Sequence, residues 1–219
     1  MIEALRARIE GEEFDYQTLL DALRDYSSPR DAITRLLRDR VIIRIKKGLY
    51  VFGPAYARRP FSRELLANLI YGPSYVSLDY ALQHYALIPE QVHAVTSITT
   101  ARATRFQTPV GLFIYRTTPV AAFWRGVARV QTESGVTALM ATREKALADK
   151  VRDDRGIAVA SVAGMLSYLL EDLRLDGARL AEFAPEPIEE LANATGSRRW
   201  RLLAAALRAH RAGADGGSR

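Results

Sequence analysis

The stretch from residue 28 to residue 53 shows the clearest periodic pattern of apolar and polar positions in the chain. Its first part places four apolar side chains on one helical face, namely Ala32, Ile33, Leu36 and Leu37. Ser28 and Pro29 are typical of a helix start, because a serine oxygen can accept from free backbone N–H groups and proline suits the first helical position. Asp31 favours the positive end of the helix dipole. The pattern therefore predicts a short amphipathic helix that begins at Ser28.

The period changes to that of a strand after residue 40. One side of this strand is apolar and the other is cationic, with Ile43 and Ile45 opposed to Arg44 and Lys46. Lys47 and Gly48 can then turn the chain, since glycine supplies the positive φ that a tight hairpin turn tends to need. Residues 49–52 follow as a return strand. We therefore expect a basic hairpin directly after the helix.

Two more short helices are expected before residue 28. The first has a stripe of Ile2, Leu5 and Ile9, and the second has a core face of Leu19, Leu20, Leu23 and Tyr26. Asp15 can cap the second helix. Three short helices followed by a hairpin match the winged variant of the helix-turn-helix, in which the later helix enters the major groove of DNA.

Glycine and proline interrupt the pattern around residues 53–60. We therefore place a domain boundary near residue 58 and expect residues 1–58 to form a winged helix-turn-helix domain. Residues 59–211 are expected to form a mixed α/β domain that ends in a helical segment, and residues 212–219 a flexible tail. The predicted fold class is α+β.

The second domain combines helical and strand-like segments. Helices are predicted over residues 62–71, 77–85 and 142–151, strands over residues 92–100, 126–131 and 136–141, and a hairpin over residues 104–116. Ser77 and Thr142 stand where N-cap residues are expected. From Ile157 onward the pattern is helical, and the final helix is expected to end near His210.

The positive charge of the chain is concentrated in one segment. The formal net charge is +6 and the sequence pI is about 9.7. From Arg24 to Arg59, ten Lys or Arg stand against three Asp, which is a net +7 and leaves about −1 for all other residues. Such a concentration is typical of phosphate binding, although a solvated helical lobe would also carry exposed cations.

Seven residues of this segment are candidate DNA contacts. We expect Arg30, Thr34 and Arg35 to meet base edges, because arginine can bond guanine in a bidentate way and threonine can meet a thymine methyl. The others are expected to meet phosphates or the minor groove, namely Arg38, Arg44, Lys46 and Lys47. For each cation the alternative is an exposed side chain without a partner.

The sequence offers little support for catalysis, a metal or a cofactor. It has no Cys and only three His, at positions 84, 93 and 210. Glu144, Lys145, Asp149 and Lys150 cluster on one short helix. Glu144 and Asp149 are five positions apart and would point to different faces, and charge pairs of the i, i+4 type are usually surface features. Ser77 and His84 would lie about 10 Å apart on a helix. We therefore expect no enzymatic activity, no catalytic residues, no metal and no cofactor.

A membrane location is not expected. The longest uncharged apolar run, from Ile157 to Leu170, is shorter than the roughly 18 residues that a membrane-spanning helix requires. The first residues lack the basic-then-apolar order of a signal peptide. The sequence therefore predicts a cytoplasmic protein without a membrane partner.

Several stretches, in this order, resemble the AbiEi family of bacterial antitoxins, which belong to type IV toxin-antitoxin systems. They are Arg44-Ile-Lys-Lys-Gly-Leu-Tyr50, Tyr75-Val-Ser-Leu-Asp-Tyr-Ala-Leu82 with Leu87-Ile-Pro-Glu90, Val95-Thr-Ser-Ile-Thr99, the hairpin of residues 106–115, and Thr142-Arg-Glu-Lys-Ala-Leu-Ala-Asp149. The resemblance covers roughly residues 14 to 152. It rests on the order of these stretches more than on any one of them.

The resemblance implies a transcriptional autorepressor that acts as an antitoxin. Its winged helix would bind inverted repeats in the double-stranded operator DNA before its own operon. Its C-terminal domain would counter a nucleotidyltransferase toxin of an abortive-infection system, with or without direct contact.

Two other functions stay open. One is a standalone winged-helix regulator whose C-terminal domain senses a small molecule. The remoter one is a metal-dependent nuclease that uses the carboxylates near residue 145.

Overall fold

The N-terminal part of the chain forms the three helices and the hairpin that the sequence predicts. The computed structural model describes residues 2–156 and 159–216. Its first elements are α1 (Ile2–Arg8), β1 (Glu13–Asp15), α2 (Tyr16–Ala22), α3 (Pro29–Arg38), β2 (Ile42–Lys46) and β3 (Leu49–Phe52). The strands form a sheet of order β1-β3-β2 with both pairs antiparallel. We call residues 2–57 the N-terminal lobe and residues 62–216 the C-terminal body.

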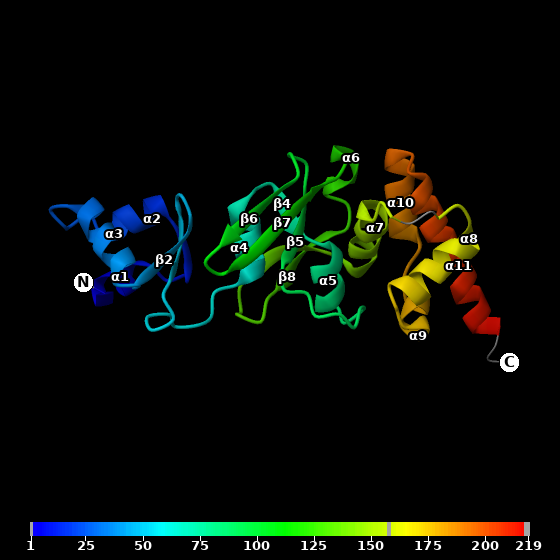
Figure 1. Cartoon of the computed structure of the whole chain (residues 1–219), viewed down its shortest axis with the longest axis horizontal. Coiled ribbons are helices and arrows are strands. Elements are labelled where there is room, and N and C mark those ends of the chain that lie inside the picture. The colour runs from blue at the N-terminus through cyan, green and yellow to red at the C-terminus, as the bar shows by residue number, and fades with distance from the viewer. Residues whose placement is uncertain (1, 157–158, 217–219) are drawn as a thin grey trace.

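The sheet of the N-terminal lobe has two buried faces. On one face Phe14 and Phe52 pack with the helices of the lobe. On the other face Ile45, Leu49 and Val51 belong to the hydrophobic core of the C-terminal body. The alternation of side chains along a strand explains this division. The sheet is therefore shared by both parts of the molecule, which Figure 1 shows side by side along its long axis.

Two glutamates hold the segment that connects the lobe to the body. The Glu12 carboxylate accepts from the buried Arg6 guanidinium at 2.6 Å and from the Arg58 backbone N–H at 3.0 Å. Glu13 accepts from the Arg59 guanidinium at 3.0 Å. The connection near residue 58 is thus tied to the lobe by charge-assisted hydrogen bonds, which are stronger than neutral ones.

Gly53 fills a position that no other residue fits. A Cβ atom there would lie 2.1 Å from the carbonyl oxygen of Arg40, while the Gly53 N–H donates to Val41 at 2.8 Å. We expect Gly53→Ala to lower the free energy of unfolding by roughly 1–3 kcal/mol, the usual cost of overpacking. Urea unfolding checks this. Gly213→Ala is the control, because nothing lies within 4 Å of a Cβ at that position, and equal midpoints for both variants would contradict the prediction.

The C-terminal body begins with a mixed α/β region. Its elements are α4 (Arg63–Ile70), β4 (Ser74–Val76), α5 (Leu78–His84), β5 (Val95–Thr99), β6 (Thr104–Thr108), β7 (Gly111–Thr117), α6 (Val120–Phe123), β8 (Val127–Gln131), β9 (Thr137–Ala141) and α7 (Arg143–Asp153). The strands form one sheet of order β6-β7-β5-β4-β9-β8. The β4/β9 and β5/β7 pairs are parallel and the other pairs are antiparallel.

The chain ends in helices. They are α8 (Val162–Ser167), the π-helix η1 (Tyr168–Asp172), α9 (Gly177–Ala181), α10 (Glu186–Thr195) and α11 (Arg198–Gly216). The predicted α+β fold with a helical end is therefore confirmed. No helix in the described part of the chain has both the length and the apolar character needed to cross a membrane.

Helices cover both faces of the larger sheet. The alternation along β4 shows this: the Ser74 hydroxyl bonds the Ala67 carbonyl of α4 at 3.4 Å, whereas the Tyr75 hydroxyl bonds Asp149 of α7 at 2.9 Å. Helix α4 faces the N-terminal lobe, and α5 and α7 lie on the opposite side (Figure 1). The C-terminal helices pack beyond α7, at the far end of the molecule from α3.

The structure corrects several expected element boundaries. Strands β1 and β4 were not expected, because three residues are too few to show a period. The helix expected from Ile157 begins only at Val162, and residues 157–158 lie outside the described residues. Helix α11 continues past His210 to Gly216, so that part of the expected tail is helical, while residues 217–219 are not described.

Two expected helix caps are confirmed and two are wrong. Asp15 accepts from the Thr18 N–H at 2.8 Å, and Thr142 accepts from the Lys145 N–H at 3.3 Å. Ser28 makes no cap bond, because its hydroxyl donates to the Asp31 carboxylate at 2.6 Å. Ser77 makes none either, since its hydroxyl is bonded elsewhere in the body.

Candidate nucleic-acid interface

Helix α3 has the two faces that its sequence predicts. Ala32, Ile33 and Leu36 are buried, whereas the four predicted contact residues of the helix are exposed, namely Arg30, Thr34, Arg35 and Arg38. The Thr34 hydroxyl donates to the Arg30 carbonyl at 3.1 Å. The Thr34 hydroxyl is therefore engaged with the backbone of its own helix.

Five cations of the N-terminal lobe are exposed and have no ion-pair or hydrogen-bond partner among the residues that the structure describes. They are Arg30, Arg35, Arg40, Arg44 and Lys47. Arg38 differs, because its guanidinium pairs with Asp39 at 3.0 Å. Cations without partners retain their full charge for a ligand. We call these five residues the free cations of the lobe.

The hairpin contributes two of the free cations. Its turn consists of Lys47 and Gly48, and Gly48 has the expected positive φ of 86°. Strand β1 pairs with β3 as far as Leu49, so the turn projects little beyond the sheet. Arg44 stands opposite Tyr50, on the side of the sheet that carries the helices of the lobe. The hairpin is therefore a short edge beside the helices rather than a long free wing.

Lys46 lies apart from the other predicted contacts. Its side chain is half-buried, and its ammonium donates to the Ile70 carbonyl at the end of α4. It thus joins the lobe to the body. Arg40, in contrast, was not among the predicted contacts, although it is exposed and has a φ of 53°. In the sequence, Arg40 is noticed only through the charge count of residues 24–59. A single residue between a helix and a strand shows no periodic pattern that would mark it as a contact.

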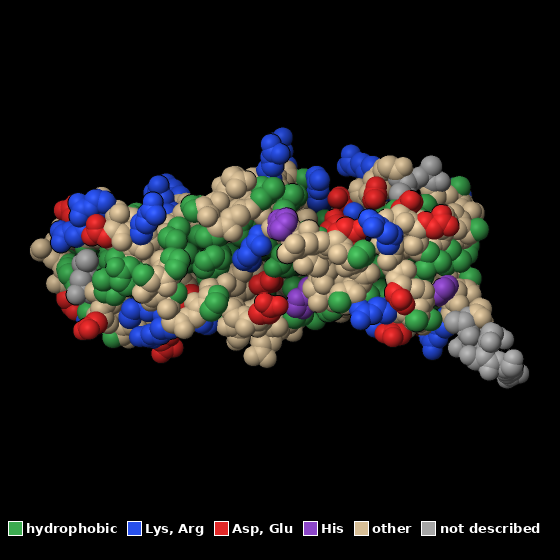
Figure 2. All heavy atoms as spheres, turned by 60° about the horizontal axis from the view of Figure 1, so that its bottom comes forward, with side chains coloured by type: hydrophobic (Ala, Val, Ile, Leu, Met, Phe, Trp, Pro, Cys, Tyr) green, Lys and Arg blue, Asp and Glu red, His purple; other side chains and the backbone are tan. Residues whose placement is uncertain are grey.

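Exposed cationic side chains are visible on the surface of the N-terminal lobe. Figure 2 shows Lys and Arg side chains along the edges of the N-terminal end, with a few acidic side chains between them. Apolar side chains also reach the surface there. One exposed apolar side chain of the lobe is Tyr16, which is 36% exposed.

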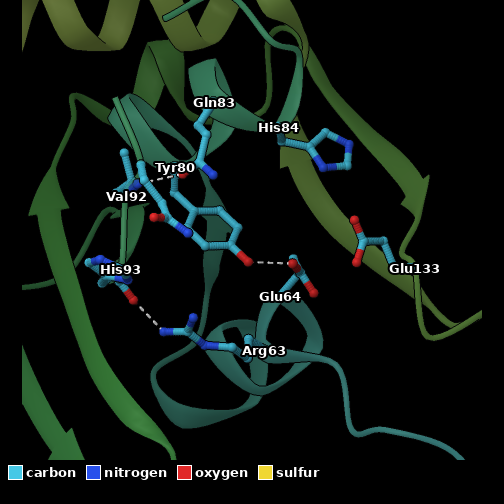
Figure 3. A pocket seen from close by; sticks show the side chains of 9 residues that line it. Arg63, Glu64, Tyr80, Gln83, His84, Val92, His93 and Glu133 are labelled. Atoms are coloured by element: carbon cyan, nitrogen blue, oxygen red, sulfur yellow. Dashed lines mark hydrogen bonds between the residues drawn. The ribbon is translucent and has the colours of Figure 1, made fainter. Parts of the chain in front are cut away.

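A polar pocket of about 350 Å³ lies in the C-terminal body between α4 and α5 (Figure 3). Its groups are largely bonded to one another. Glu64 accepts from the hydroxyls of Tyr80 at 2.5 Å and Ser62 at 2.7 Å. Burial of Glu64 opposes ionisation, but these hydrogen bonds outweigh it, so the pKa of Glu64 lies below its usual value. Arg63 donates to the carbonyl of His93.

The pocket does not bring Ser77 and His84 together. His84 is exposed at the pocket, beside Glu133 and Glu64 (Figure 3). Ser77 is fully buried and donates to Asp149 at 2.8 Å. Within the described residues, no group of three or more His, Cys, Asp or Glu is arranged to hold a metal ion.

The expected surface position of the charges on α7 is wrong for one pair. Lys145 is 1% exposed and Asp149 is 2% exposed, and their side chains are 2.8 Å apart. The second carboxylate oxygen of Asp149 accepts from Tyr75 and Ser77. Burial and the adjacent carboxylate raise the pKa of the Tyr75 hydroxyl, which therefore remains a donor. We call these four residues the buried polar cluster.

The buried polar cluster joins two of the stretches that carry the family resemblance. Tyr75 and Ser77 come from β4 and its end, and Lys145 and Asp149 come from α7. The Lys145 ammonium also lies 5.4 Å from the ring centre of Trp200 in α11. The side chains of the buried polar cluster satisfy one another's hydrogen-bonding groups inside the body. These four residues of the two stretches therefore belong to the core rather than to an exposed site.

The fold has a counterpart among solved structures. The crystal structure of the RV2827C protein from Mycobacterium tuberculosis aligns with 96% of this chain and 79% of that chain, with a TM-score of 0.56. The sequences are 17% identical, so the similarity shows a common fold alone. No family model matches the sequence, and no curated protein matches it.

Proposed function

We propose that this protein is a sequence-specific DNA-binding regulator whose N-terminal lobe is a winged helix-turn-helix. The observation that carries the proposal is the set of free cations on α3 and the neighbouring hairpin. In this proposal the outer face of α3 enters the major groove, where Arg30, Thr34 and Arg35 meet base edges. Arg44 and Lys47 neutralise phosphates at the edge of the lobe.

The proposal is tested by titrating the full chain with the DNA that precedes its own gene. At fixed salt, we expect this duplex to bind at least about tenfold more tightly than a scrambled duplex of equal length. Inverted repeats are the expected binding sites. Equal affinity for both duplexes, or no binding to either, would overturn the proposal.

We further propose that the regulator is an antitoxin that represses its own operon and opposes a nucleotidyltransferase toxin. The support is the resemblance to the AbiEi family. Four residues of the stretches that carry this resemblance form the buried polar cluster and lie in the core, so the resemblance supports a related body more directly than an antitoxic activity. Co-expression with a nucleotidyltransferase encoded beside this gene tests the role, and unchanged toxicity would contradict it.

A regulator that senses a small molecule is the second candidate, and the polar pocket of Figure 3 is the observation in its favour. In that case the body would respond to a ligand instead of a toxin. Rescue from the toxin supports the antitoxin role, whereas release of operator DNA by a metabolite extract supports the sensor.

The two neighbouring lysines of the hairpin are expected to have different effects on DNA affinity and on stability when they are replaced by alanine. Lys47→Ala should weaken binding to operator and scrambled duplexes by the same factor, and reduce the slope of log Kd against log salt by about one. Lys46→Ala should leave the affinity unchanged but lower the free energy of unfolding by about 1 kcal/mol, because it loses the bond to Ile70. Salt-dependent titration and urea unfolding of both variants check this pair. A lower DNA affinity for Lys46→Ala would contradict it.

A further inference from the structure

A second basic site lies in the C-terminal body, away from α3. It is a cleft of about 690 Å³ between the end of β7, the end of α7 and the start of α11. Four arginines line it, Arg116, Arg152, Arg155 and Arg199, together with Asp153, Thr117 and Ala103. Four arginines against one aspartate give the lining a formal charge of +3. We call it the arginine cleft.

Hydrogen bonds hold two of the arginines in place. The Arg152 guanidinium donates to the Thr117 carbonyl at 2.6 Å, and the Arg199 guanidinium donates to the Asp154 carbonyl at 2.7 Å. A carbonyl oxygen orients a guanidinium but does not cancel its charge. Because a guanidinium has five N–H donors, the single bond of Arg152 leaves most of its donors for a ligand.

The other two arginines are more exposed. Arg116 lies 3.3 Å from the Asp153 carboxylate, and about half of its side-chain surface is exposed. Arg155 is exposed and has no partner among the residues that the structure describes. The cleft therefore combines oriented guanidinium groups with accessible ones.

We propose that the arginine cleft binds a small molecule that carries a diphosphate group. The planar fork of arginine matches phosphate oxygens in a bidentate way, and several converging forks favour a ligand with several negative charges. The volume is within the range of small-molecule sites, about 300–1,000 Å³. The site is concave, and the elements that form it, β7, α7 and α11, lie in the C-terminal body and not beside α3 (Figure 1), which favours a small ligand over a long duplex. The proposal does not depend on the DNA-binding function.

Calorimetric titration of the full chain tests the proposal. The probes are pyrophosphate and ADP, which distinguish a free diphosphate from one on a nucleoside, with citrate and a single-stranded oligonucleotide as comparisons. We expect pyrophosphate or ADP to bind at least about tenfold more tightly than citrate. No binding of either diphosphate at millimolar concentration, equal binding of citrate, or binding of the oligonucleotide alone would each overturn the proposal.

Substitutions then locate the site. Arg155→Ala and Arg116→Ala are expected to weaken diphosphate binding about tenfold or more, because each removes a charge-assisted contact. Arg211→Ala is the matched control, since Arg211 is an exposed arginine outside the cleft, and it should change the affinity less than twofold. Circular dichroism confirms that the variants fold. Equal weakening by all three variants, or by none, would refute the assignment to the cleft.

Discussion

Replacing Arg35 by alanine is expected to weaken binding to the operator by roughly 1–3 kcal/mol, or about 5- to 150-fold, and to relax the preference at one base pair. Arg35 is exposed on the outer face of α3 and has no partner in the described part of the chain, so its loss leaves the fold unchanged. Gel-shift titrations of operator and scrambled duplexes measure the effect. The operator should lose affinity, whereas the scrambled duplex should change little beyond the loss of one charge.

Arg38→Ala is the matched control for this result. Arg38 lies on the same face of the same helix, but its guanidinium pairs with Asp39. Its removal should therefore cost less, and it should cost the same on both duplexes, because a phosphate contact has no sequence preference. If Arg35→Ala weakens both duplexes equally, Arg35 does not contact bases and the orientation of α3 in the groove must differ.

Replacing Lys145 by methionine is expected to destabilise the C-terminal body by about 3–5 kcal/mol. The change leaves the Asp149 carboxylate in the core without its cation, and its remaining partners are the hydroxyls of Tyr75 and Ser77. A substitution that leaves a buried charge without a partner is among the few single changes with so large an effect on stability. Urea unfolding at neutral pH, followed by tryptophan fluorescence, measures it.

Lys150→Met is the control for the buried pair. Lys150 follows on the same helix and lies 2.8 Å from Asp79, but 20% and 36% of these two side chains are exposed. Water screens such a pair, so its loss should cost at most about 1 kcal/mol. Equal destabilisation by the two variants would show that Lys145 contributes no more than a surface ion pair.

Local periodicity predicted the parts of the fold that depend on local contacts. The faces of α3, the β2–β3 hairpin with Gly48 at its turn, and the threonine cap of α7 could all be read from the sequence. In each case the residues that decide the structure stand within a few positions of one another. The candidate contacts on α3 were accessible to prediction for the same reason.

Long-range contacts decided the parts that were missed. Strand β4 has three residues and is held between β5 and β9, which are distant in the sequence. Ser77 has the position of a cap, but a carboxylate 72 residues further along the chain binds its hydroxyl. The alternation along β2 predicts an exposed Lys46, but its ammonium donates to the Ile70 carbonyl at the end of α4. No local pattern contains such partners.

The sheet between the lobe and the body limits how this protein can be divided. Cutting the chain at residue 58 would place Ile45, Leu49 and Val51 in water, because their partners lie beyond the cut. An isolated fragment of residues 1–58 would thus carry an apolar β-surface that invites self-association. The N-terminal lobe is therefore not an interchangeable module: grafting it onto a foreign effector requires an acceptor that brings its own apolar cover for this sheet.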